Sequence, residues 1–325
     1  MEAHVYSAYK TETAIVARGR VVNASTLITA PDNEESPLRR LHRTLAYGQL
    51  APVRNAPFFV KIGSTHHPVM TNASGYFELE SAIADAKPYS TLEIFDAESK
   101  KAKRTSIGRS HILDIQNKKT ILISDLDGTI IDNKPYNQFR LFLNTMISSS
   151  EIMTPFENAG LFFGKLQKND IPVFYVSSSP DQLYPRLQRF LVSKGMPQGP
   201  LYLKPLKHRD LKGQIAELKN NTDSKTQQIT DILNAFPNHQ FILLGDDAND
   251  DVEIFEELEK NFSHQLKLVA IHKINSASKT QTRGKQLPYV SYEDLTLKCV
   301  DLGICLLYTS PSPRDATLSR MPSSA

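Results

Sequence analysis

Hydrophobic and polar positions follow two different patterns along this chain, and the change falls near residue 115. Before it, short stretches alternate between apolar and polar side chains or form apolar runs bounded by turn residues. Such stretches predict half-buried strands. We expect strands at residues 13–22, 58–62, 69–80 (with a turn at 72–75) and 91–95, and one helix at 37–47. Residues 1–115 therefore predict a small β-rich, sandwich-like domain.

From residue 116 onwards, short apolar runs alternate with stretches of helical periodicity. The helix expected at residues 181–194 would begin after Ser179 and Pro180, a capping residue and a first-turn proline, and stop at Gly195. Strands that alternate with helices form parallel sheets covered on both faces. We predict an α/β fold with a doubly wound parallel sheet over residues 116–304. Its strands are expected at residues 121–124, 173–176, 201–203, 241–244 and 266–271, and its other helices at 136–149, 155–168, 223–235 and 250–261.

Carboxylate and hydroxyl side chains follow three of the predicted core strands. Asp125 and Asp127 follow the first strand, Ser177 ends the second, and Asp246 follows the third. Ligand sites of open α/β sheets lie beyond the carboxyl ends of the strands, so these groups would meet in one crevice. Paired carboxylates repel each other, and a bound divalent cation is the usual compensation. Acidic turn residues before Gly128 are the alternative, which the recurrence at two further strands weakens.

These residues resemble the motifs of the haloacid dehalogenase superfamily of aspartate-nucleophile phosphatases. Residues 125–129 match its first motif, Ser177 its second and residues 245–251 its fourth, and Lys225 stands where the family has a lysine. Residues 175–185, 197–201, 236–237 and 251–255 resemble the actin-patch-type phosphatidate phosphatase family and its bacterial relatives. The resemblance spans residues 115–262. It implies a β-rich module before the phosphatase domain, and the short connection at 130–172 leaves room for a small cap or none.

The resemblance implies roles for the two aspartates of the first motif. Asp125 would be the nucleophile that forms an aspartyl-phosphate, which splits one difficult displacement into two. Asp127 would protonate the leaving oxygen and then act as a base towards water. For that role its pKa should be raised by the neighbouring carboxylates.

The second motif and the lysine imply contacts with the transferred group. Ser177 would donate a hydrogen bond to the phosphoryl group, although Ser179 is an equal candidate for this contact or for capping the next helix. Lys225 would neutralise phosphoryl oxygens and hold the nucleophile. An exposed lysine in the first turn of a helix is the alternative, with Lys212 and Lys219 as fallback candidates.

The expected metal ligands are oxygen atoms. They comprise Asp125, Asp246 and the backbone carbonyl of Asp127, with Asp251 binding through water or orienting Lys225. Oxygen-only ligation, without paired cysteines or histidines, favours Mg²⁺ over zinc.

Three positions need a separate interpretation. Asp247 departs from the resembling family, which has a small hydroxyl residue there, and helix capping is an equal interpretation for Asp247 and Asp250. Gly128 also departs, because the close relatives often carry a second acid at this position, although the wider superfamily accepts glycine.

Composition and charge bear on partners and location. The chain of 325 residues is 40% hydrophobic and 22% charged, which is typical of globular proteins. A net charge of +3 argues against a general polyanion binder, so no nucleic acid is expected. Cys299 and Cys305 form no disulfide framework. We see no signal peptide and no membrane-spanning run, and expect a cytoplasmic protein that reaches any lipid substrate peripherally.

Two further segments were interpreted from their composition. A basic cluster at residues 204–212 would contact anionic headgroups, each cation contributing about 1 kcal/mol, but a solvated loop is the stronger interpretation. Residues 305–325 lack apolar periodicity and read like a translated sequencing adaptor, so we expect the native chain to be interrupted near Ile304.

Together, these features predict a Mg²⁺-dependent phosphomonoesterase that works through an aspartyl-phosphate. The family resemblance favours phosphatidate as substrate, with diacylglycerol and phosphate as products. A soluble phosphorylated metabolite or a polynucleotide end is the alternative substrate. A non-catalytic scaffold, whose N-terminal domain binds a protein partner of unknown kind, is the alternative class.

Overall fold

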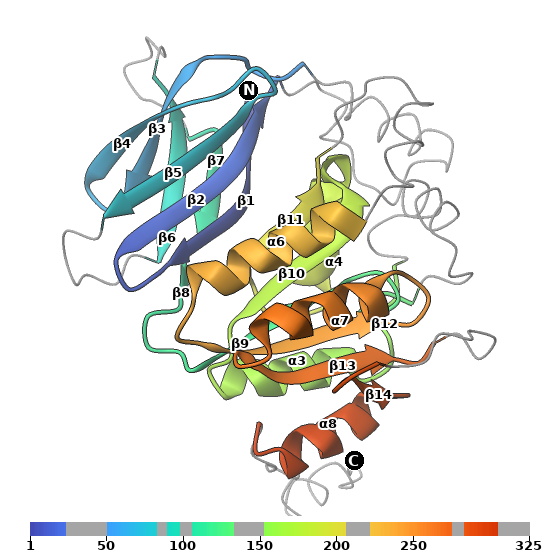
Figure 1. The fold of residues 1–325 in the computed structure, drawn as a ribbon. Helices are drawn as coiled ribbons and strands as arrows, with labels where there is room; N and C mark the ends of the chain where they lie inside the picture. The colour runs from blue at the N-terminus through green and yellow to red at the C-terminus, as the bar shows by residue number, and fades with distance from the viewer. Residues whose placement is uncertain are drawn as a thin grey trace, which may run out of the picture.

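A computed structural model describes residues 1–23, 51–82, 90–97, 106–132, 153–205, 222–274 and 283–304 (Figure 1). Over these ranges the chain forms two mainly antiparallel sheets and then one parallel sheet with helices on both faces. The segments predicted as helices at 37–47 and 136–149, and the tail at 305–325, lie outside the described residues.

The first two sheets, antiparallel except for the β1–β8 pair, pack face to face as a sandwich. One has the strand order β5-β2-β1-β8 and the other β4-β3-β6-β7. Apolar residues of both sheets form one core, which includes Ala17 from the first sheet and Val60 and Ile94 from the second. This confirms the predicted sandwich-like arrangement. The strands are β1 (Glu2–Lys10), β2 (Ala14–Val22), β3 (Pro57–Ile62), β4 (Thr65–Met70), β5 (Tyr76–Ala82), β6 (Thr91–Asp96), β7 (Gly108–His111) and β8 (Leu113–Asp114).

Strand β1 was not predicted, because its side chains do not alternate between core and solvent. Val5 packs in the sandwich core, whereas Tyr9 packs in the core of the parallel-sheet region. The ring of Tyr9 lies 5.5 Å from those of Phe174 and Phe236. The strand is therefore covered on both faces, and the two parts of the molecule share a hydrophobic contact. The domain boundary near residue 115 stays a prediction.

The second part of the chain is built on a parallel sheet of six strands in the order β11-β10-β9-β12-β13-β14. Every neighbouring pair is parallel. The central strand β9 is buried on both faces, which explains its unbroken apolar run. The strands are β9 (Thr120–Ser124), β10 (Val173–Pro180), β11 (Leu201–Lys204), β12 (Gln240–Asp246), β13 (Leu266–His272) and β14 (Leu287–Tyr289).

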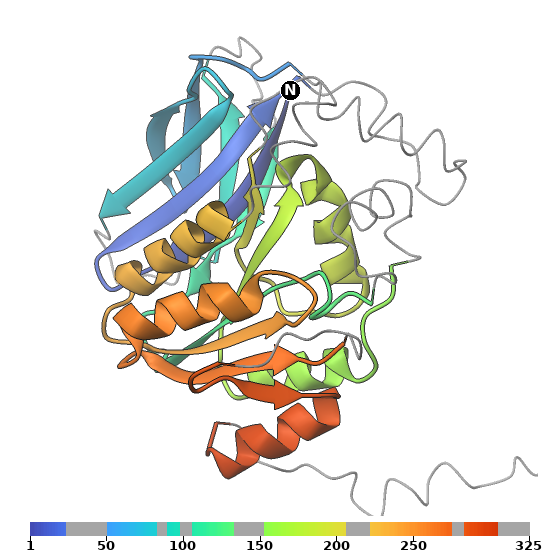
Figure 2. The same cartoon turned by 45° about the vertical axis from the view of Figure 1, so that its right-hand side comes forward.

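Helices cover both faces of this sheet, which confirms the doubly wound prediction. Leu122 of β9 packs with residues of α3, α4 and α8, whereas Ile121 and Ile123 pack with residues of α6 and α7. Figures 1 and 2 show α6 and α7 side by side across one face. The helices are α3 (Ala159–Lys168), the 3-10 turn η3 (Asp181–Leu183) with α4 (Tyr184–Ser193), α6 (Thr222–Ala235), α7 (Asp251–Phe262) and α8 (Tyr292–Asp301).

The helix predicted at 181–194 is present and begins at Asp181, but its first turn is a 3-10 turn and not an α-helix. Strand β10 continues to Pro180, a 3-10 turn follows, and the α-helix begins at Tyr184. The helix ends before Gly195 as predicted, because Gly195 has a φ of 67°, a left-handed conformation that favours glycine. Ser179 and Pro180 are therefore part of strand β10, and Ser179 does not cap a helix.

Candidate active site

The turn after β9 brings the first motif to the carboxyl end of the sheet. The backbone nitrogen of Gly128 donates to the carbonyl of Ile131 at 3.0 Å and closes the turn. Gly128 has a φ of 82°, a conformation that costs glycine little. A Cβ atom at this position would lie 2.9 Å from Cγ of Asp246. The absence of a side chain at Gly128 therefore leaves space for Asp246. An acidic residue at this position, as expected for close relatives, would require Asp246 or the turn to move.

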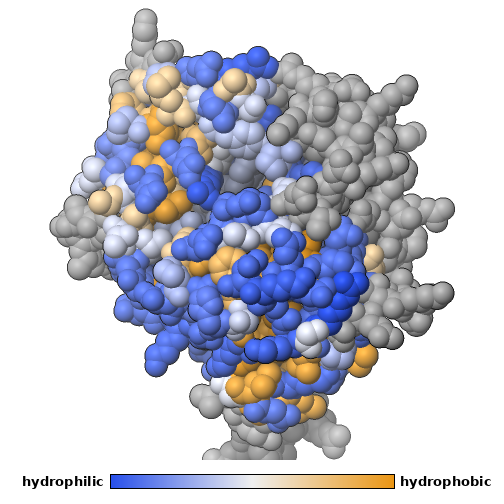
Figure 3. Space-filling model, in the orientation of Figure 1, coloured by the Kyte–Doolittle hydropathy of each residue, from blue (hydrophilic) through white to orange (hydrophobic). Residues whose placement is uncertain are grey.

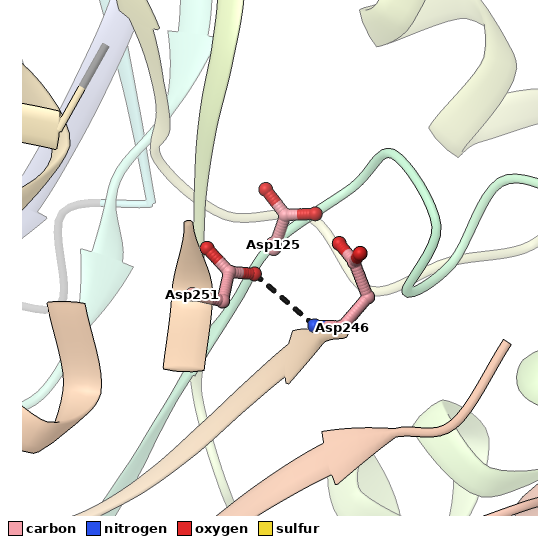
Figure 4. A group of neighbouring side chains, drawn as sticks. All are labelled: Asp125, Asp246 and Asp251. Atoms are coloured by element: carbon pink, nitrogen blue, oxygen red, sulfur yellow. Dashed lines mark hydrogen bonds between the residues drawn. The ribbon is translucent and has the colours of Figure 1, made fainter. Parts of the chain in front are cut away.

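Three buried carboxylates meet beyond the ends of β9 and β12 (Figure 4). Asp125 follows β9, Asp246 ends β12, and Asp251 begins α7. One carboxylate oxygen from each residue lies within 4.8 Å of one from each of the others. The backbone nitrogen of Asp246 donates to Oδ2 of Asp251 at 3.2 Å, which ties the start of α7 to the end of β12. The convergence predicted for Asp125 and Asp246 is present in the structure.

Lys225 enters this cluster from the first turn of α6. Its Nζ donates to Oδ1 of Asp125 at 2.6 Å and to Oδ1 of Asp251 at 2.5 Å. The side chain is 5% exposed, so the alternative of an exposed lysine is wrong. Burial lowers the pKa of Lys225, but the two carboxylates outweigh this and raise its pKa above the ordinary value. The lysine is therefore an ammonium at neutral pH. Lys212 and Lys219 lie outside the described residues.

The cluster contains three carboxyl groups and one ammonium group, so acidic groups outnumber basic ones. Burial raises the pKa of Asp125 well above its usual range, against the lowering effect of Lys225, and the other carboxylates raise it further. Burial, with the charge of Asp251, raises the pKa of Asp246 to about 7. Three carboxylates facing one ammonium leave two negative charges uncompensated when all are ionised. In addition, Oδ2 of Asp125 is buried and has no hydrogen-bond partner among the described residues. These oxygen donors fit a divalent cation.

Asp127 points into a group of hydroxyls at the end of β10. Its Oδ2 accepts hydrogen bonds from Oγ of Ser179 at 2.8 Å and from Oγ of Ser177 at 3.2 Å. The backbone nitrogen of Ser179 donates in turn to Oγ of Ser177 at 3.0 Å. Both serines therefore face the first motif, and the capping interpretation of Ser179 is wrong. The choice between them as the phosphoryl contact stays a prediction.

Asp247 and Asp250 have different surroundings. Oδ2 of Asp247 forms an ion pair with Lys273 at 2.7 Å, and its Oδ1 accepts from the backbone nitrogen of Ile274 at 3.0 Å. Asp247 therefore anchors the chain after β13, and its capping interpretation is wrong. Asp250 occupies the N-cap position of α7, but its side chain makes no capping hydrogen bond.

Sequence reasoning missed two residues that hold the site. Nδ2 of Asn249 donates to both oxygens of Asp246, at 3.2 and 3.1 Å, and so sets the direction of that carboxylate. His272, at the end of β13, donates from Nδ1 to the carbonyl of Gly128 at 3.0 Å. Burial lowers the pKa of His272, so it is a neutral donor. A histidine at the end of an apolar strand was a visible signal, whereas Asn249 gave none.

Of the basic residues in the predicted cluster, the structure describes only Lys204. Lys204 is 8% exposed, and residues 206–212 lie outside the described ranges. Figure 3 shows hydrophobic side chains gathered at the end of the molecule formed by α8, where Leu297 and Leu302 are 59% and 49% exposed. No helix in the described part of the chain is long and apolar enough to cross a membrane.

A doubly wound parallel sheet with aspartates, serines and a lysine beyond its central strands fits the haloacid dehalogenase class that the sequence resembles. Residues 120–273 match the family model of the phosphatidate phosphatase APP1 catalytic domain. This match confirms the predicted family resemblance. It covers the motifs built around Asp125, Ser177, Lys225 and Asp246.

Two curated relatives and one solved structure illustrate the likeness. The chain is 30% identical over 152 residues to phosphatidate phosphatase APP1 of Saccharomyces cerevisiae, covering 46% of this chain and 25% of that protein. It is 22% identical over 236 residues to an uncharacterized protein of Schizosaccharomyces pombe, covering 68% of this chain and 38% of that one. A class C acid phosphatase from Bacillus anthracis is 15% identical with a TM-score of 0.29, over 46% of this chain and 66% of that one, which is too distant to bear on function. The chain thus spans well under half the length of the curated relatives.

Proposed function

We propose that this chain is a Mg²⁺-dependent phosphomonoesterase that works through an aspartyl-phosphate on Asp125. The observation that carries the proposal is the buried cluster in which Lys225 bridges Asp125 and Asp251 beside Asp246. The nucleophile thus lies against an ammonium group and within reach of a cation site. Such preorganised charge stabilises the developing negative charge of a phosphoryl transfer.

The chemistry proceeds in two displacements at phosphorus. In the first, a carboxylate oxygen of Asp125 forms a bond to phosphorus while the bond to the ester oxygen breaks, and Asp127 gives a proton to that oxygen. In the second, Asp127 takes a proton from water as the water attacks phosphorus, and the bond to Asp125 breaks. The products are the free alcohol and inorganic phosphate.

The residues that would hold the cation are Asp125, Asp246 and Asp251, with the backbone carbonyl of Asp127. A bound Mg²⁺ would neutralise the phosphoryl oxygens that approach these carboxylates. Asn249 holds Asp246 in position for this contact.

Asp127 has an orientation that suits proton transfer. Its Oδ2 accepts hydrogen bonds from Ser177 and Ser179, so the proton for the leaving group belongs on Oδ1. The two hydroxyls restrict the rotation of the carboxyl group. When a substrate binds, the hydroxyl of Ser177 can turn to the phosphoryl group, which is the role that the family resemblance implies.

Phosphatidate is the substrate that we propose, because the relative from Saccharomyces cerevisiae is a phosphatidate phosphatase. The test is release of phosphate from vesicles that contain phosphatidate, compared with a panel of soluble phosphoesters and a phosphorylated oligonucleotide, with Mg²⁺ or with EDTA. We expect Mg²⁺-dependent hydrolysis that favours phosphatidate, and sedimentation of the protein with these vesicles if it is a peripheral cytoplasmic enzyme. Preference for a soluble ester would select the alternative substrate, and Mg²⁺ binding without hydrolysis of any ester would select the scaffold.

Metal removal should change stability as well as activity. Mg²⁺ at 100 times its Kd is expected to raise the free energy of unfolding by about 2.7 kcal/mol. Burial raises the folded-state pKa of Asp246 from 3.8 to about 7, so the folded chain binds more protons than the unfolded chain between these values. The contribution of Asp246 to stability without metal therefore falls as the pH rises through this window, while the gain from Mg²⁺ grows. Thermal unfolding in EDTA and in Mg²⁺ at several pH values measures both effects.

The matched control for this measurement is Asp246→Asn, which keeps the shape of the side chain but has no charge to titrate. It should lose most of the Mg²⁺ effect and the corresponding pH dependence. An equal response to Mg²⁺ in the variant and the unmodified chain would exclude Asp246 from the metal site.

A further inference from the structure

We propose that Arg20 and Tyr76 of the N-terminal sandwich are positioning residues for the active site. They hold Asp181, and through it the segment at residues 177–179 that orients Asp127. The proposal rests on the proposed role of Asp127 in proton transfer. It gives the sandwich a part in the reaction, although the sandwich contributes no residue to the carboxylate cluster.

The buried carboxylate of Asp181 links the parallel-sheet region to the sandwich. Its side chain is 2% exposed, and its Oδ2 pairs with Nη1 of Arg20 at 3.2 Å. The hydroxyl of Tyr76 donates to the same oxygen. Both partners come from the sandwich, from neighbouring strands β2 and β5, and more than a hundred residues separate them from Asp181 along the chain.

Contacts within the sandwich fix the positions of Arg20 and Tyr76 independently of Asp181. They are directly opposite each other in the β2–β5 register. The guanidinium of Arg20 lies over the ring of Tyr76, 5.2 Å from its centre, in a cation–π arrangement. Nε of Arg20 donates to the carbonyl of Ser74 at 3.1 Å. This pair, which we call the Arg20–Tyr76 clamp, therefore presents two fixed donors to one carboxylate oxygen.

The charges of the clamp are suited to a buried carboxylate. Burial lowers the pKa of Arg20, but Asp181 and the adjacent tyrosines outweigh this and raise it. Burial raises the pKa of Tyr76, and the charge of Asp181 raises it further, so the hydroxyl keeps its proton and donates. Removal of one partner from a buried ion pair leaves a charge that is poorly compensated, which displaces or destabilises the group that carries it.

The position of Asp181 affects the positions of Ser177 and Ser179 because the chain between them is short. Asp181 follows Pro180, the last residue of β10, whose ring fixes its φ. The pairing of β10 with β11 is irregular between Val176 and Pro180, so the strand ladder does not hold residues 177–179 on that side. Their position depends on the anchors at either end, and Asp181 is the anchor at the carboxyl end.

A second contact from the sandwich supports the same turn. The hydroxyl of Tyr184 donates to the carbonyl of Val5 at 2.5 Å. The ring of Tyr184 packs edge-on against that of Tyr6, with 4.8 Å between centres. The turn from Asp181 to Tyr184 is thus attached to strands β1, β2 and β5, and it cannot move without breaking contacts with the sandwich.

The variant Tyr76→Phe tests this proposal, because it removes one hydroxyl and keeps the ring. A misplaced Asp127 should matter most for an ester whose leaving oxygen needs a proton. We therefore compare kcat/KM for glycerol 3-phosphate, a poor leaving group, with kcat/KM for p-nitrophenyl phosphate, a good one. We expect a fall of roughly tenfold for glycerol 3-phosphate and less than about twofold for p-nitrophenyl phosphate. A clamp that only stabilised the fold would lower both by the same factor.

Two further variants make the test specific. Arg18 and Glu78 form an ion pair between the same strands, but their side chains are 40% and 60% exposed. Arg18→Met is therefore the matched control and should leave both substrates unchanged. In an Asp127→Asn background, Tyr76→Phe should have no further effect on kcat/KM, because the two residues act through one group.

Equal losses for the two esters, no loss for either, or additive effects with Asp127→Asn would overturn the proposal. Arg20→Lys, which keeps the charge and loses the planar fork, should give the same pattern and replaces Tyr76→Phe if that variant does not fold. If the unmodified protein hydrolyses phosphatidate but neither of these esters, the proposed function stands. If it hydrolyses no phosphoester in Mg²⁺, phosphatidate included, the proposed function fails. In either case amide hydrogen exchange tests the contact between the clamp and Asp181. The amides of residues 177–184 should exchange faster in Tyr76→Phe than in Arg18→Met, and equal exchange rates would overturn the proposal.

Discussion

The Asp125→Asn variant is expected to lose phosphatase activity by at least roughly 10⁴-fold, the scale of loss when a catalytic nucleophile is removed. Asn has nearly the same shape as Asp but cannot attack phosphorus to form an acyl phosphate. Lys225 keeps its bond to Asp251 in the variant, so we expect the fold to be retained. The loss would therefore come from chemistry.

Two measurements separate chemistry from folding. Acid quenching of the unmodified protein with radiolabelled substrate should trap labelled protein, whereas Asp125→Asn should trap none. Thermal unfolding should show a small change for the variant. Asp170→Asn is the matched control, because Asp170 has an 82% exposed side chain and a φ of 62° that asparagine tolerates. Turnover or labelling that persists in Asp125→Asn would exclude the aspartyl-phosphate on this residue.

The Lys225→Met variant should show the largest combined effect on stability and activity. Without the ammonium group, Asp125 and Asp251 face each other in a buried site. Breaking a buried ion pair in this way costs about 3–5 kcal/mol of unfolding free energy. Because the pKa of Lys225 is raised above 10.5, its contribution to stability is present throughout the range below that value and is lost only at higher pH.

The activity of Lys225→Met is expected to fall by roughly 10²–10³-fold, as for the loss of one preorganised electrostatic partner. Mg²⁺ should restore part of the stability, because a cation compensates the same carboxylates, but not the activity. The control is Lys298→Met, because Lys298 pairs with Asp294 on the surface of α8 and should change stability by less than about 1 kcal/mol. Equal stability losses in the two variants would show that Lys225 is not an essential partner of the cluster.

The positions of the site residues along the chain followed from local pattern. The apolar run at residues 121–124 is a strand covered on both faces, and such strands carry little polar periodicity. In an open parallel sheet, groups at the carboxyl ends of neighbouring strands must lie together. Asp125 and Asp246 could therefore be expected in one crevice from the sequence, and the structure shows that β9 and β12 are neighbours in the sheet. The family resemblance supplied the roles of these residues.

The local sequence pattern gave wrong predictions for short polar residues that could either cap a helix or bond to a distant group. Ser179 before Pro180 is a good helix start, but the same hydroxyl bonds to Asp127 and the strand continues. Asp247 near the start of α7 is a plausible cap, but its carboxylate pairs with Lys273. Serine and aspartate side chains form hydrogen bonds or ion pairs with local and with distant groups equally well, so their sequence context does not select between these partners.

Side-chain periodicity and residue types close together in the chain were enough to predict most of the strands and helices, the carboxylates at the strand ends and the class of enzyme. The folded structure was needed to choose between a buried and an exposed Lys225, which it places between Asp125 and Asp251, and to find the Arg20–Tyr76 clamp at the turn after β10. Such contacts join segments that are distant along the chain. Their formation depends on which faces of the strands and helices pack together in the folded protein, and the local sequence pattern does not determine this packing.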